Sequence, residues 1–510
     1  MSGADTVTLA EVGLIRGMLR LVPRPSNQAV LSYFTRPGRD LNHRLISEIA
    51  EGWRWAHVPP ASQADTLSFM ALAASMPPMD HHSFVSGDDY YESDGGSVAR
   101  PIGNISLDWW PVGQGLFSTG ALRLNNGSAV HWAYDCGSTS SAALITSAIA
   151  QYRRRLQTWG ASRLTLMVLS HFDKDHISGV VELLRGLPVR TFLLPYVPLW
   201  RRLVIAMEQG VGAADPLIRF FEDPVAYLSE QDGIEIDEIV FVPGVGPDDR
   251  VPGAPDAGES PPDGLPDGSV DELKVEHGSP PAEAAGDPAV EDASSVRVSF
   301  LKKGGRLLVP SFWEFVPYND SQPAVHATPL FLRRAGLVIR IFLGDPSRRS
   351  RALARLKKVY DHHFGSGPVE RNLISLFLYS GAIGRISLRH YYATDCVDFS
   401  RRADAFGQLL TGDGYLDSPQ RLNDLRRYLS ADARFDRAGI FQVMHHGARG
   451  NWHAGAAAAI QPAVSIFSSD PGHKGYRHPH AEVLRDFWPY CPVRVGRTRG
   501  FHFHGFLQTR

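Results

Sequence analysis

The feature that most constrains this chain is an apolar run that ends in a cluster of histidine and aspartate side chains. Residues 164–169 (LTLMVL) have the composition of a short buried strand, and the sequence SHFDKDH follows directly at 170–176. In an α/β sheet, ligands and metals gather at the carboxyl ends of strands, because loops converge there above a rigid backbone. A turn at that point can direct four metal-binding side chains to one place: His171, Asp173, Asp175 and His176. The alternative is a solvated polar turn in which Asp175 caps a helix.

Strand-like and helix-like segments alternate around this cluster, which is typical of an α/β fold. Residues 107–124 and 131–135 are predicted as paired strands, because Asn125-Asn126-Gly127 between them is a turn sequence. Apolar residues at helical spacing predict a helix over 140–159, and a shorter helix is expected over 177–187. Beyond residue 300 we expect strands at 337–343, at 373–379, before Thr411 and at 440–444, and a helix that starts after Asp345-Pro346.

Residues 243–295 differ in composition from the rest of the chain. They contain ten prolines, no aromatic residue and 13 aspartates and glutamates, against only Arg250 and Lys274. Such a composition buries too little apolar surface to order itself, so it predicts a disordered acidic linker. The segment carries a net charge of −11 in a chain of net charge −2, so the remainder is basic, at about +9. A basic body suits a polyanionic ligand, although surplus arginine is also common on ordinary surfaces.

Cysteine and membrane chemistry are not expected. Cys136, Cys396 and Cys491 show neither a CxxC pair nor a zinc-finger spacing, which argues against a thiolate zinc site and a disulfide framework. The 20 histidines, several of them beside aspartate and glycine, favour a metal site of imidazole and carboxylate ligands instead. No window approaches about 18 uncharged apolar residues, and the first residues lack a signal-peptide pattern. We therefore expect a cytoplasmic protein with no membrane partner.

Short motifs rich in glycine, aspartate and histidine occur along residues 107–510. Besides the cluster at 170–176, they are Val112-Gly113-Gln114-Gly115, Asp135-Cys136-Gly137, Asn372 with Ser375, Thr411-Gly412-Asp413, His445-His446-Gly447 and His478-Pro479. In this order they resemble the metallo-β-lactamase-fold hydrolases and, more narrowly, the hydrolase domain of ComEC-type DNA-uptake proteins. The resemblance covers neither residues 1–100 nor residues 195–365, and Ser178 stands where the family has a glycine.

The resemblance implies an α/β protein built as a metallo-β-lactamase αββα sandwich. Residues 101–510 would form the hydrolase domain, and residues 1–100 an N-terminal extension of unknown role. His176 and Asp413 are 237 residues apart. A large insertion at 195–365 would therefore separate the metal-binding halves and include the linker at 243–295. The insertion or the extension could also bind a protein partner.

The same resemblance implies a centre with two divalent metal ions. His171 and Asp173 would hold one ion, Asp413 would bridge both ions, and the second ion would be held by Asp175, His176 and His445. Two such ions activate a water and bind the oxygens of a displacement at phosphorus. Because Asp173 replaces a second histidine, Mn²⁺ or Mg²⁺ suits the first position as well as Zn²⁺ does.

Three further residues are assigned supporting roles by the resemblance. Asp135 is expected to accept a hydrogen bond from a ligand histidine and to fix its tautomer, and His446 either neighbours a ligand or simply packs. His478 would contact the phosphate or act as general acid, which makes Asp175 and His478 the expected catalytic residues; alternatively, His478 is a turn histidine before a proline. The extra histidine of the wider superfamily has no clear match among His326, His362, His363 and His390.

A basic helix provides a weaker signal for the substrate. Six basic side chains follow Asp345-Pro346 and could either bind phosphate groups or simply face solvent: Arg348, Arg349, Arg351, Arg355, Lys357 and Lys358. A second basic cluster, Arg153 to Arg155, precedes the apolar run.

We therefore predict a metal-dependent hydrolase, in first place a phosphodiesterase or nuclease that acts on DNA or another nucleic acid. A phosphodiesterase for small nucleotides and a lactam or thioester hydrolase are the enzymatic alternatives, and the latter usually keep the histidine that Asp173 replaces. A non-catalytic binding protein is the third alternative, and the complete set of ligands argues against it.

Overall fold

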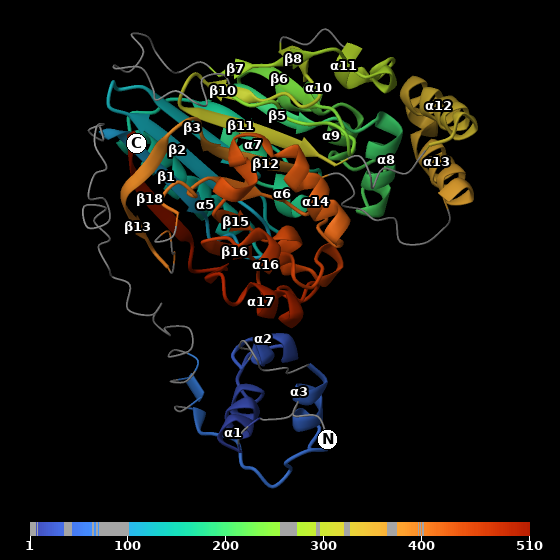
Figure 1. Ribbon diagram of the computed structural model, residues 1–510. Helices are drawn as coiled ribbons and strands as arrows, with labels where there is room; N and C mark the ends of the chain where they lie inside the picture. Colours follow the sequence, from blue (N-terminus) through green and yellow to red (C-terminus); the bar gives the residue numbers. More distant parts are fainter. Residues whose placement is uncertain are drawn as a thin grey trace.

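The computed structural model describes most of the chain, with gaps (Figure 1). The described residues are 7–70, 101–254, 273–291, 296–320, 327–364 and 375–509, without residues 8, 35–42, 64–65, 68–69, 396, 398, 400 and 401. Two mixed β-sheets and the helices around them make this an α/β protein, as the sequence predicts.

The first sheet has ten strands among the described residues. In spatial order they are β13 (Ile386–Ala393), β18 (Phe501–Thr509), β1 (Pro101–Trp109), β2 (Ser118–Leu124), β3 (Ala129–Tyr134), β4 (Leu164–Val168), β5 (Val189–Pro195), β6 (Ile236–Val242), β9 (Arg297–Leu301) and β8 (His277–Gly278). Strands β3, β4, β5, β6 and β9 run parallel, whereas β13, β18, β1 and β2 form an antiparallel part.

The second sheet has eight strands in the described part of the chain. Their order is β17 (Pro492–Val495), β16 (Val464–Ser468), β15 (Ile440–Gln442), β14 (Gln408–Leu410), β12 (Leu376–Ala382), β11 (Trp313–Asn319), β10 (Leu307–Val309) and β7 (Lys274–Val275). Strands β14 to β17 run parallel, and β12, β11, β10 and β7 are antiparallel. Each sheet therefore has a parallel part whose strands can deliver side chains to one edge.

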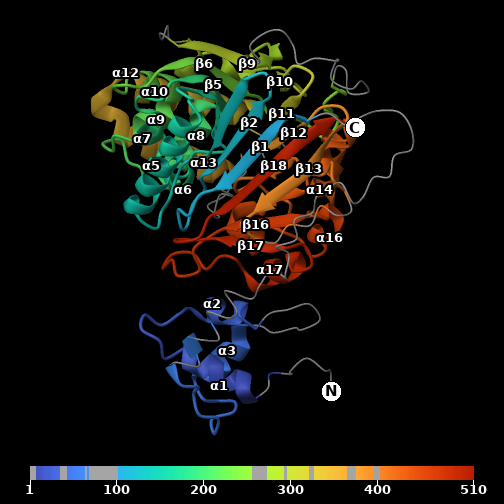
Figure 2. The same cartoon turned by 90° about the vertical axis from the view of Figure 1, so that its left-hand side faces the viewer.

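Three large apolar clusters define the layers of the molecule. One lies between the two sheets, where Trp132 of β3 packs against Trp313 and Phe315 of β11. The second lies on the outer face of the first sheet and the third on the outer face of the second sheet, each covered by helices. Figure 2 shows the two sets of helices on opposite sides of the sheets. The layers are therefore helix, sheet, sheet, helix.

The helices fall into two sets according to the sheet that they cover. On the side of the first sheet lie α5 (Ala142–Thr158), α6 (Lys174–Ile177), α7 (Val180–Leu184), α8 (Leu199–Glu208), α9 (Ile218–Glu222), α10 (Pro224–Ser229), α11 (Pro288–Glu291), α12 (Pro329–Gly344) and α13 (Arg349–Phe364). On the side of the second sheet lie α14 (Pro419–Tyr428), α15 (Arg434–Arg437), α16 (Ala456–Ile460) and α17 (Ala481–Phe487).

Three N-terminal helices pack around a small apolar cluster of their own. They are α1 (Leu9–Met18), α2 (Asn27–Ser32) and α3 (His43–Ala50). The cluster includes Val12, Ile15 and Ile46, and Ala481 of α17 joins it. In Figure 1 these dark blue helices lie beyond α17, so the extension touches the body through the helices of the second sheet.

Most of the expected elements are present, and local chemistry explains them. The turn at Asn125-Asn126-Gly127 joins β2 and β3, with Gly127 at a φ of 89° that favours glycine. The strand expected over 107–124 is instead two strands, β1 and β2, because residues 110–117 leave the sheet as a loop. The helix expected after Asp345 is α13, and the Asp345 side chain accepts a hydrogen bond from the Ser347 N–H.

The strand predicted at 337–343 is wrong, because these residues belong to α12. Thr328 caps this helix by accepting from the Phe331 N–H, and Pro329 occupies its first turn. Within 337–343, apolar side chains lie on both the packed and the exposed side of α12: Val338 and Phe342 are buried, whereas Leu337 is 56% exposed. A short run that is apolar on both sides of a helix cannot be told from a strand by its periodicity.

The disordered linker predicted at 243–295 is also wrong for the part that the structure describes. Strand β7 pairs with β10 and strand β8 pairs with β9, and Asp287 is only 3% exposed. The remaining residues, 255–272 and 292–295, lie outside the described residues. Strands from the expected insertion at 195–365 belong to both sheets.

Two further expectations concern cysteines and membrane helices. Cys136 is a buried free thiol, whereas Cys491 forms a disulfide, which the cysteine spacing does not predict. Within the described ranges, every helix is too short or too polar to cross a lipid bilayer.

The carboxylate of Asp287 shows what orders the acidic segment. Its two oxygens accept from the guanidinium of Arg202 on α8 at 2.9 and 2.7 Å. Arg202 is 1% exposed and also donates to the backbone oxygens of Val197, Phe221 and Glu222. This ion pair fixes the end of the segment to the helices of the first sheet.

We expect Asp287→Ala to lower the free energy of unfolding by about 3–5 kcal/mol, because it leaves the buried charge of Arg202 unpaired. Chemical denaturation followed by circular dichroism measures the change. Glu283→Ala removes an exposed acid from the same segment and should change stability by no more than about 0.5 kcal/mol. Equal stabilities of the two variants would show that the ion pair does not order this segment.

Candidate metal centre

Histidine and aspartate side chains from both sheets meet at one edge of the molecule. His171, Asp173, Asp175 and His176 follow β4, as the sequence predicts. Asp413 follows β14, and His445 and His446 follow β15. Both strands lie in the parallel part of the second sheet, so the carboxyl ends of two sheets supply one site.

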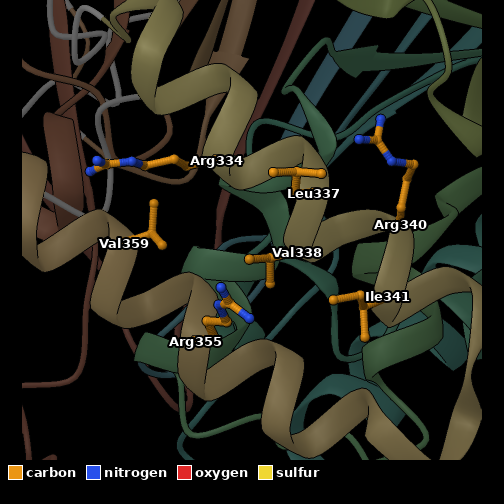
Figure 3. A pocket seen from close by; sticks show the side chains of 7 residues that line it. All are labelled: Arg334, Leu337, Val338, Arg340, Ile341, Arg355 and Val359. Carbon is orange, nitrogen blue, oxygen red and sulfur yellow. The ribbon is translucent and has the colours of Figure 1, made fainter.

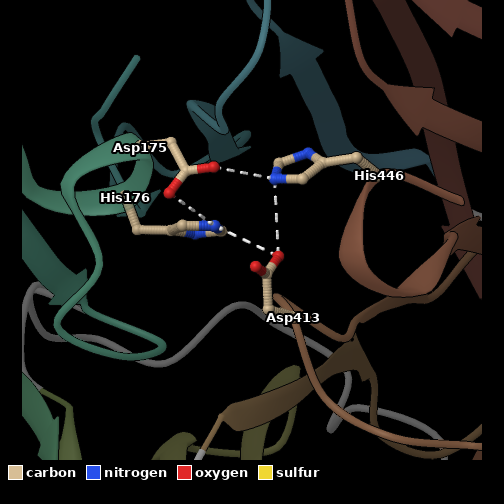
Figure 4. A group of neighbouring side chains, drawn as sticks. All are labelled: Asp175, His176, Asp413 and His446. Atoms are coloured by element: carbon tan, nitrogen blue, oxygen red, sulfur yellow. Dashed lines mark hydrogen bonds and ion pairs between the residues drawn. The ribbon is translucent and has the colours of Figure 1, made fainter. Parts of the chain in front are cut away.

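Four of these side chains form a compact inner group around Oδ1 of Asp413 (Figure 4). Oδ1 lies 3.2 Å from Nε2 of His176 and 3.5 Å from Nε2 of His446. Asp175 closes the group, with Oδ2 3.1 Å from Nε2 of His446 and Oδ1 4.0 Å from Nε2 of His176. One potential ligand atom from each residue lies within 4.8 Å of all the others, which is close enough to surround one cation.

A second, outer group surrounds the other oxygen of Asp413. Oδ2 lies 3.3 Å from Nε2 of His445 and 3.6 Å from Nε2 of His171. Asp173 completes the group, with Oδ2 4.0 Å from Nε2 of His171. The side chains of Asp173 and His445 are 20% and 22% exposed, whereas that of His176 is 0% exposed. The outer group therefore faces solvent, and Asp413 offers one oxygen to each group.

Each histidine of the two groups has a hydrogen-bond partner at Nδ1, which directs Nε2 into the centre. Nδ1 of His171 lies 2.8 Å from Oγ of Ser170, and Nδ1 of His176 lies 2.7 Å from Oδ2 of Asp135. On the second sheet, His445 contacts Oδ1 of Asn451 at 2.8 Å, and His446 contacts the backbone oxygen of Ser468 at 2.5 Å. Partners of this kind orient metal-binding imidazoles and fix their tautomer.

Asp135 bonds to Ser170 at the end of β4 and to His176. Its Oδ1 accepts from the Ser170 N–H at 2.7 Å, and its Oδ2 accepts from the Ser170 hydroxyl at 2.6 Å as well as contacting His176. Asp135 is fully buried and adopts a φ of 54°, in the left-handed region. Such a backbone conformation costs energy in a non-glycine residue and persists only where its surroundings enforce it.

Three side chains hold the loop that carries Asp413, and one of them, Asn451, donates to the backbone oxygens of Asp413 and Gly414. The Gln442 amide accepts from the N–H groups of Thr411 and Gly412 and donates to the backbone oxygen of Val443. Oγ of Ser375 accepts from the Asp413 N–H at 3.0 Å. Gln442 and Asn451 were not predicted as site residues, because an amide side chain carries no sequence signal until its partners in the loop are known.

Glycines of the early motifs allow the backbone to approach the centre closely. A Cβ on Gly137 would lie 2.5 Å from the backbone of Asp175 and His176, and one on Gly115 would lie 2.3 Å from the backbone oxygen of Gly137. The backbone oxygen of Asp175 accepts from the Leu116 N–H. The Val112-Gly113-Gln114-Gly115 loop therefore supports the helix turn that presents Asp175 and His176.

The carboxylates and imidazoles of the two groups shift the pKa values of one another. Burial alone raises the pKa of the Asp175 carboxyl, but His176 and His446 outweigh this effect and lower the pKa to about 2. Burial likewise raises the pKa of Asp173, to about 6. Nε2 of His171 and Nε2 of His176 are buried and make no hydrogen bond within the described part of the chain. Buried imidazole nitrogens that face carboxylates fit a cation.

His478 lies beside the centre and begins a series of rings that leads to the surface. Its ring lies 5.4 Å from that of His445 and 6.3 Å from that of His446, and it stacks on Tyr476 at 6.0 Å. Tyr476 in turn stacks on His473 at 5.1 Å and is 43% exposed. Burial and the nearby His445 and His446 rings lower the pKa of His478 to about 2, so its ring is neutral at pH 7.

The structure differs from the expected ligand assignment at the two adjacent histidines. His446, expected beside a ligand, joins Asp175 and His176, whereas His445, expected in that group, lies with His171. Both residues have positive φ angles, 44° and 57°, and this backbone turns the two rings toward different oxygens of Asp413. Asn372 lies outside the described residues, as does His326.

The basic side chains that were expected to bind substrate are only partly available. Ion pairs join Arg348 to Asp345, Arg349 to Glu222 and Lys357 to Asp361. The other three, Arg351, Arg355 and Lys358, are exposed and form no ion pair with a described residue. In the second basic cluster, Arg153 bonds to backbone oxygens and Arg155 to Asp108. His362 and His363 end α13, and His390 on β13 stacks on Phe506.

No family model matches the chain, and no curated protein matches it significantly.

The geometry predicts how many metal ions each variant binds. We expect the wild-type protein to bind two Mn²⁺ ions and Asp413→Ala to bind none, because Asp413 contributes an oxygen to both groups. His446→Ala and His445→Ala should bind one ion each, because each variant loses a histidine of one group only. Equilibrium dialysis with metal analysis measures this, and circular dichroism checks folding. His480→Ala, which removes a neighbouring histidine outside both groups, should still bind two ions. Two ions bound by Asp413→Ala would contradict the shared carboxylate.

Proposed function

We propose that this protein is a two-metal phosphodiesterase of the metallo-β-lactamase fold that acts on nucleic acid. The observation that carries the proposal is the position of Asp413, which directs one oxygen to a group of two histidines and an aspartate and the other oxygen to a second such group. The layer order of helix, sheet, sheet, helix supports the αββα sandwich that the motif order implies.

The donor sets support particular metals. Two divalent cations in these groups would activate a water and neutralise the charge that develops on a phosphate. Four imidazoles favour Zn²⁺ or Mn²⁺ over Mg²⁺, which prefers oxygen ligands. The inner group, which is the more deeply buried, would hold the more tightly bound ion.

The residues of the chain would supply substrate contacts beside that centre. His478 is neutral and close to both groups, so it can donate a hydrogen bond to a phosphate oxygen. Tyr476 stacks on His473 and His478 and is still 43% exposed, so an unpaired nucleobase could contact the exposed part of its ring. Lys474 and Arg477 are exposed on the same loop. These features favour a nucleic acid over a lactam, which has neither a phosphate nor a nucleobase.

We expect Asp175→Ala to remain folded and to lose at least about a hundredfold in kcat on a DNA oligonucleotide with Mn²⁺ or Zn²⁺, because the activated water supplies most of the barrier reduction. Asp417→Ala, an exposed aspartate near Asp413 in sequence, is the matched control and should keep its activity. RNA, cyclic dinucleotides and a β-lactam complete the substrate panel. Turnover of the lactam alone would end the phosphodiesterase proposal.

Tyr476 provides a separate test of the nucleic-acid substrate. Tyr476→Ala should raise KM for single-stranded DNA about tenfold and leave kcat within about twofold, since stacking of one base contributes about 1–3 kcal/mol. Tyr476→Phe should behave as the wild type because it keeps the ring. Tyr392→Ala removes a tyrosine of similar exposure, 49%, from β13 and serves as control. An unchanged KM in Tyr476→Ala would contradict base stacking at this loop.

A further inference from the structure

Helices α12 and α13 form a hairpin on the side of the first sheet, and its charge is strongly one-sided. It packs on α8, where Trp200 contacts Phe331 at 4.9 Å and Tyr360 at 6.4 Å. Residues 329–364 contain nine arginines and lysines but only Asp345 and Asp361 as acids. Both acids are already paired, with Arg348 and Lys357.

The outer side of this hairpin is a groove of about 700 Å³ (Figure 3). Its lining is apolar except for three arginines, and it consists of Arg334, Leu337, Val338, Arg340, Ile341, Arg355 and Val359. Within the lining, Leu337 is 56% exposed. Leu330 and Leu332, which are also on α12 but outside the lining, are 45% and 40% exposed. The groove therefore presents an exposed leucine between its arginines.

The three arginines of the groove lie among the aliphatic side chains of its lining. Arg334 and Arg340 come from α12 and Arg355 from α13, and Figure 3 shows them at separate points around the aliphatic side chains. None of the three forms an ion pair with a described residue, although Arg348 and Arg349 nearby do. An apolar floor bordered by unpaired guanidinium groups is complementary to an apolar ridge with carboxylates at its sides.

We propose that this groove binds an acidic amphipathic helix of a partner protein. The leucine or isoleucine side chains of that helix would enter the groove over Leu337, Ile341 and Val359, and its glutamates or aspartates would pair with the three arginines. No residue of the metal centre lines this groove, so the groove can bind its partner whether or not the protein is a hydrolase.

The groove suits a helix better than it suits the other polyanions. Nucleic acid would use the basic side chains but not the leucines, and the large aromatic side chains Phe331, Phe342 and Tyr360 are buried, so they cannot stack on bases. A membrane surface would need apolar side chains on a convex face, whereas Val338 and Val359 line a concave one.

Binding of a designed peptide to the full-length protein tests the proposal. The probe is a fluorescein-labelled peptide as long as α12, with leucines on one helical face and glutamates on both sides of them, and a scrambled peptide of the same composition is its control. We expect a Kd of about 10 µM for the probe and a Kd at least about tenfold higher for the scrambled peptide, measured by fluorescence anisotropy.

Matched variants locate the binding surface. Arg334→Glu/Arg340→Glu/Arg355→Glu should raise Kd at least about tenfold, whereas Arg333→Glu/Arg351→Glu/Lys358→Glu, with the same change of charge outside the groove, should raise it less than about threefold. Leu337→Asp should weaken binding, and Leu332→Asp, an exposed leucine outside the lining, should not. All the substituted side chains except the control positions line the groove, and all of them are exposed, so folding should be retained.

Three results would overturn the proposal. One is the absence of saturable peptide binding, and another is an equal loss in the two triple variants, which would show diffuse charge attraction. The third is binding of oligo(dT) or of phosphatidylserine vesicles that depends on the groove arginines while the peptide does not bind, which would assign the groove to nucleic acid or to a membrane instead.

Discussion

The buried carboxylate of Asp413 is the point on which the organisation of the site depends. A carboxylate with 2% exposure is costly unless positive charge surrounds it. The fold supplies four imidazoles around it, two from the end of β4 and two from the end of β15, so the two sheets must meet at this edge. The hydrogen bonds described above, from those of Asp135 to those of Gln442, fix the positions of these strand ends relative to one another.

Local patterns in the sequence predicted the parts of this site that depend on one strand end. The apolar strand followed by His171, Asp173, Asp175 and His176 is a continuous segment, so its turn can be read directly. The assignment of His445 and His446 could not be read in this way. Their positions depend on two consecutive positive φ angles and on contacts with Asn451 and Ser468, which come from other segments.

The acidic segment at 243–295 shows why average composition does not predict whether a segment is ordered. A mean over 53 residues correctly reports that the segment is poor in apolar side chains, but order here depends on single contacts. Two-residue strands extend the edges of both sheets, and the buried carboxylate of Asp287 is paired with Arg202. Neither feature changes the average composition. The wrong prediction of a strand at 337–343 has a related origin. Apolar side chains on both the packed and the exposed side of α12 remove the helical periodicity of this segment.

Helix α8 links the hairpin groove to the metal centre physically. Its Trp200 supports the hairpin through Phe331 and Tyr360, and Gln209 at its end donates to the carboxylate of Asp173 in the outer group. The side chain of Asp173 is 20% exposed, and the Gln209 amide connects it to α8. A shift of α8 would therefore move a side chain of the outer group and leave the inner group, which is held by Asp135 and Ser468, in place.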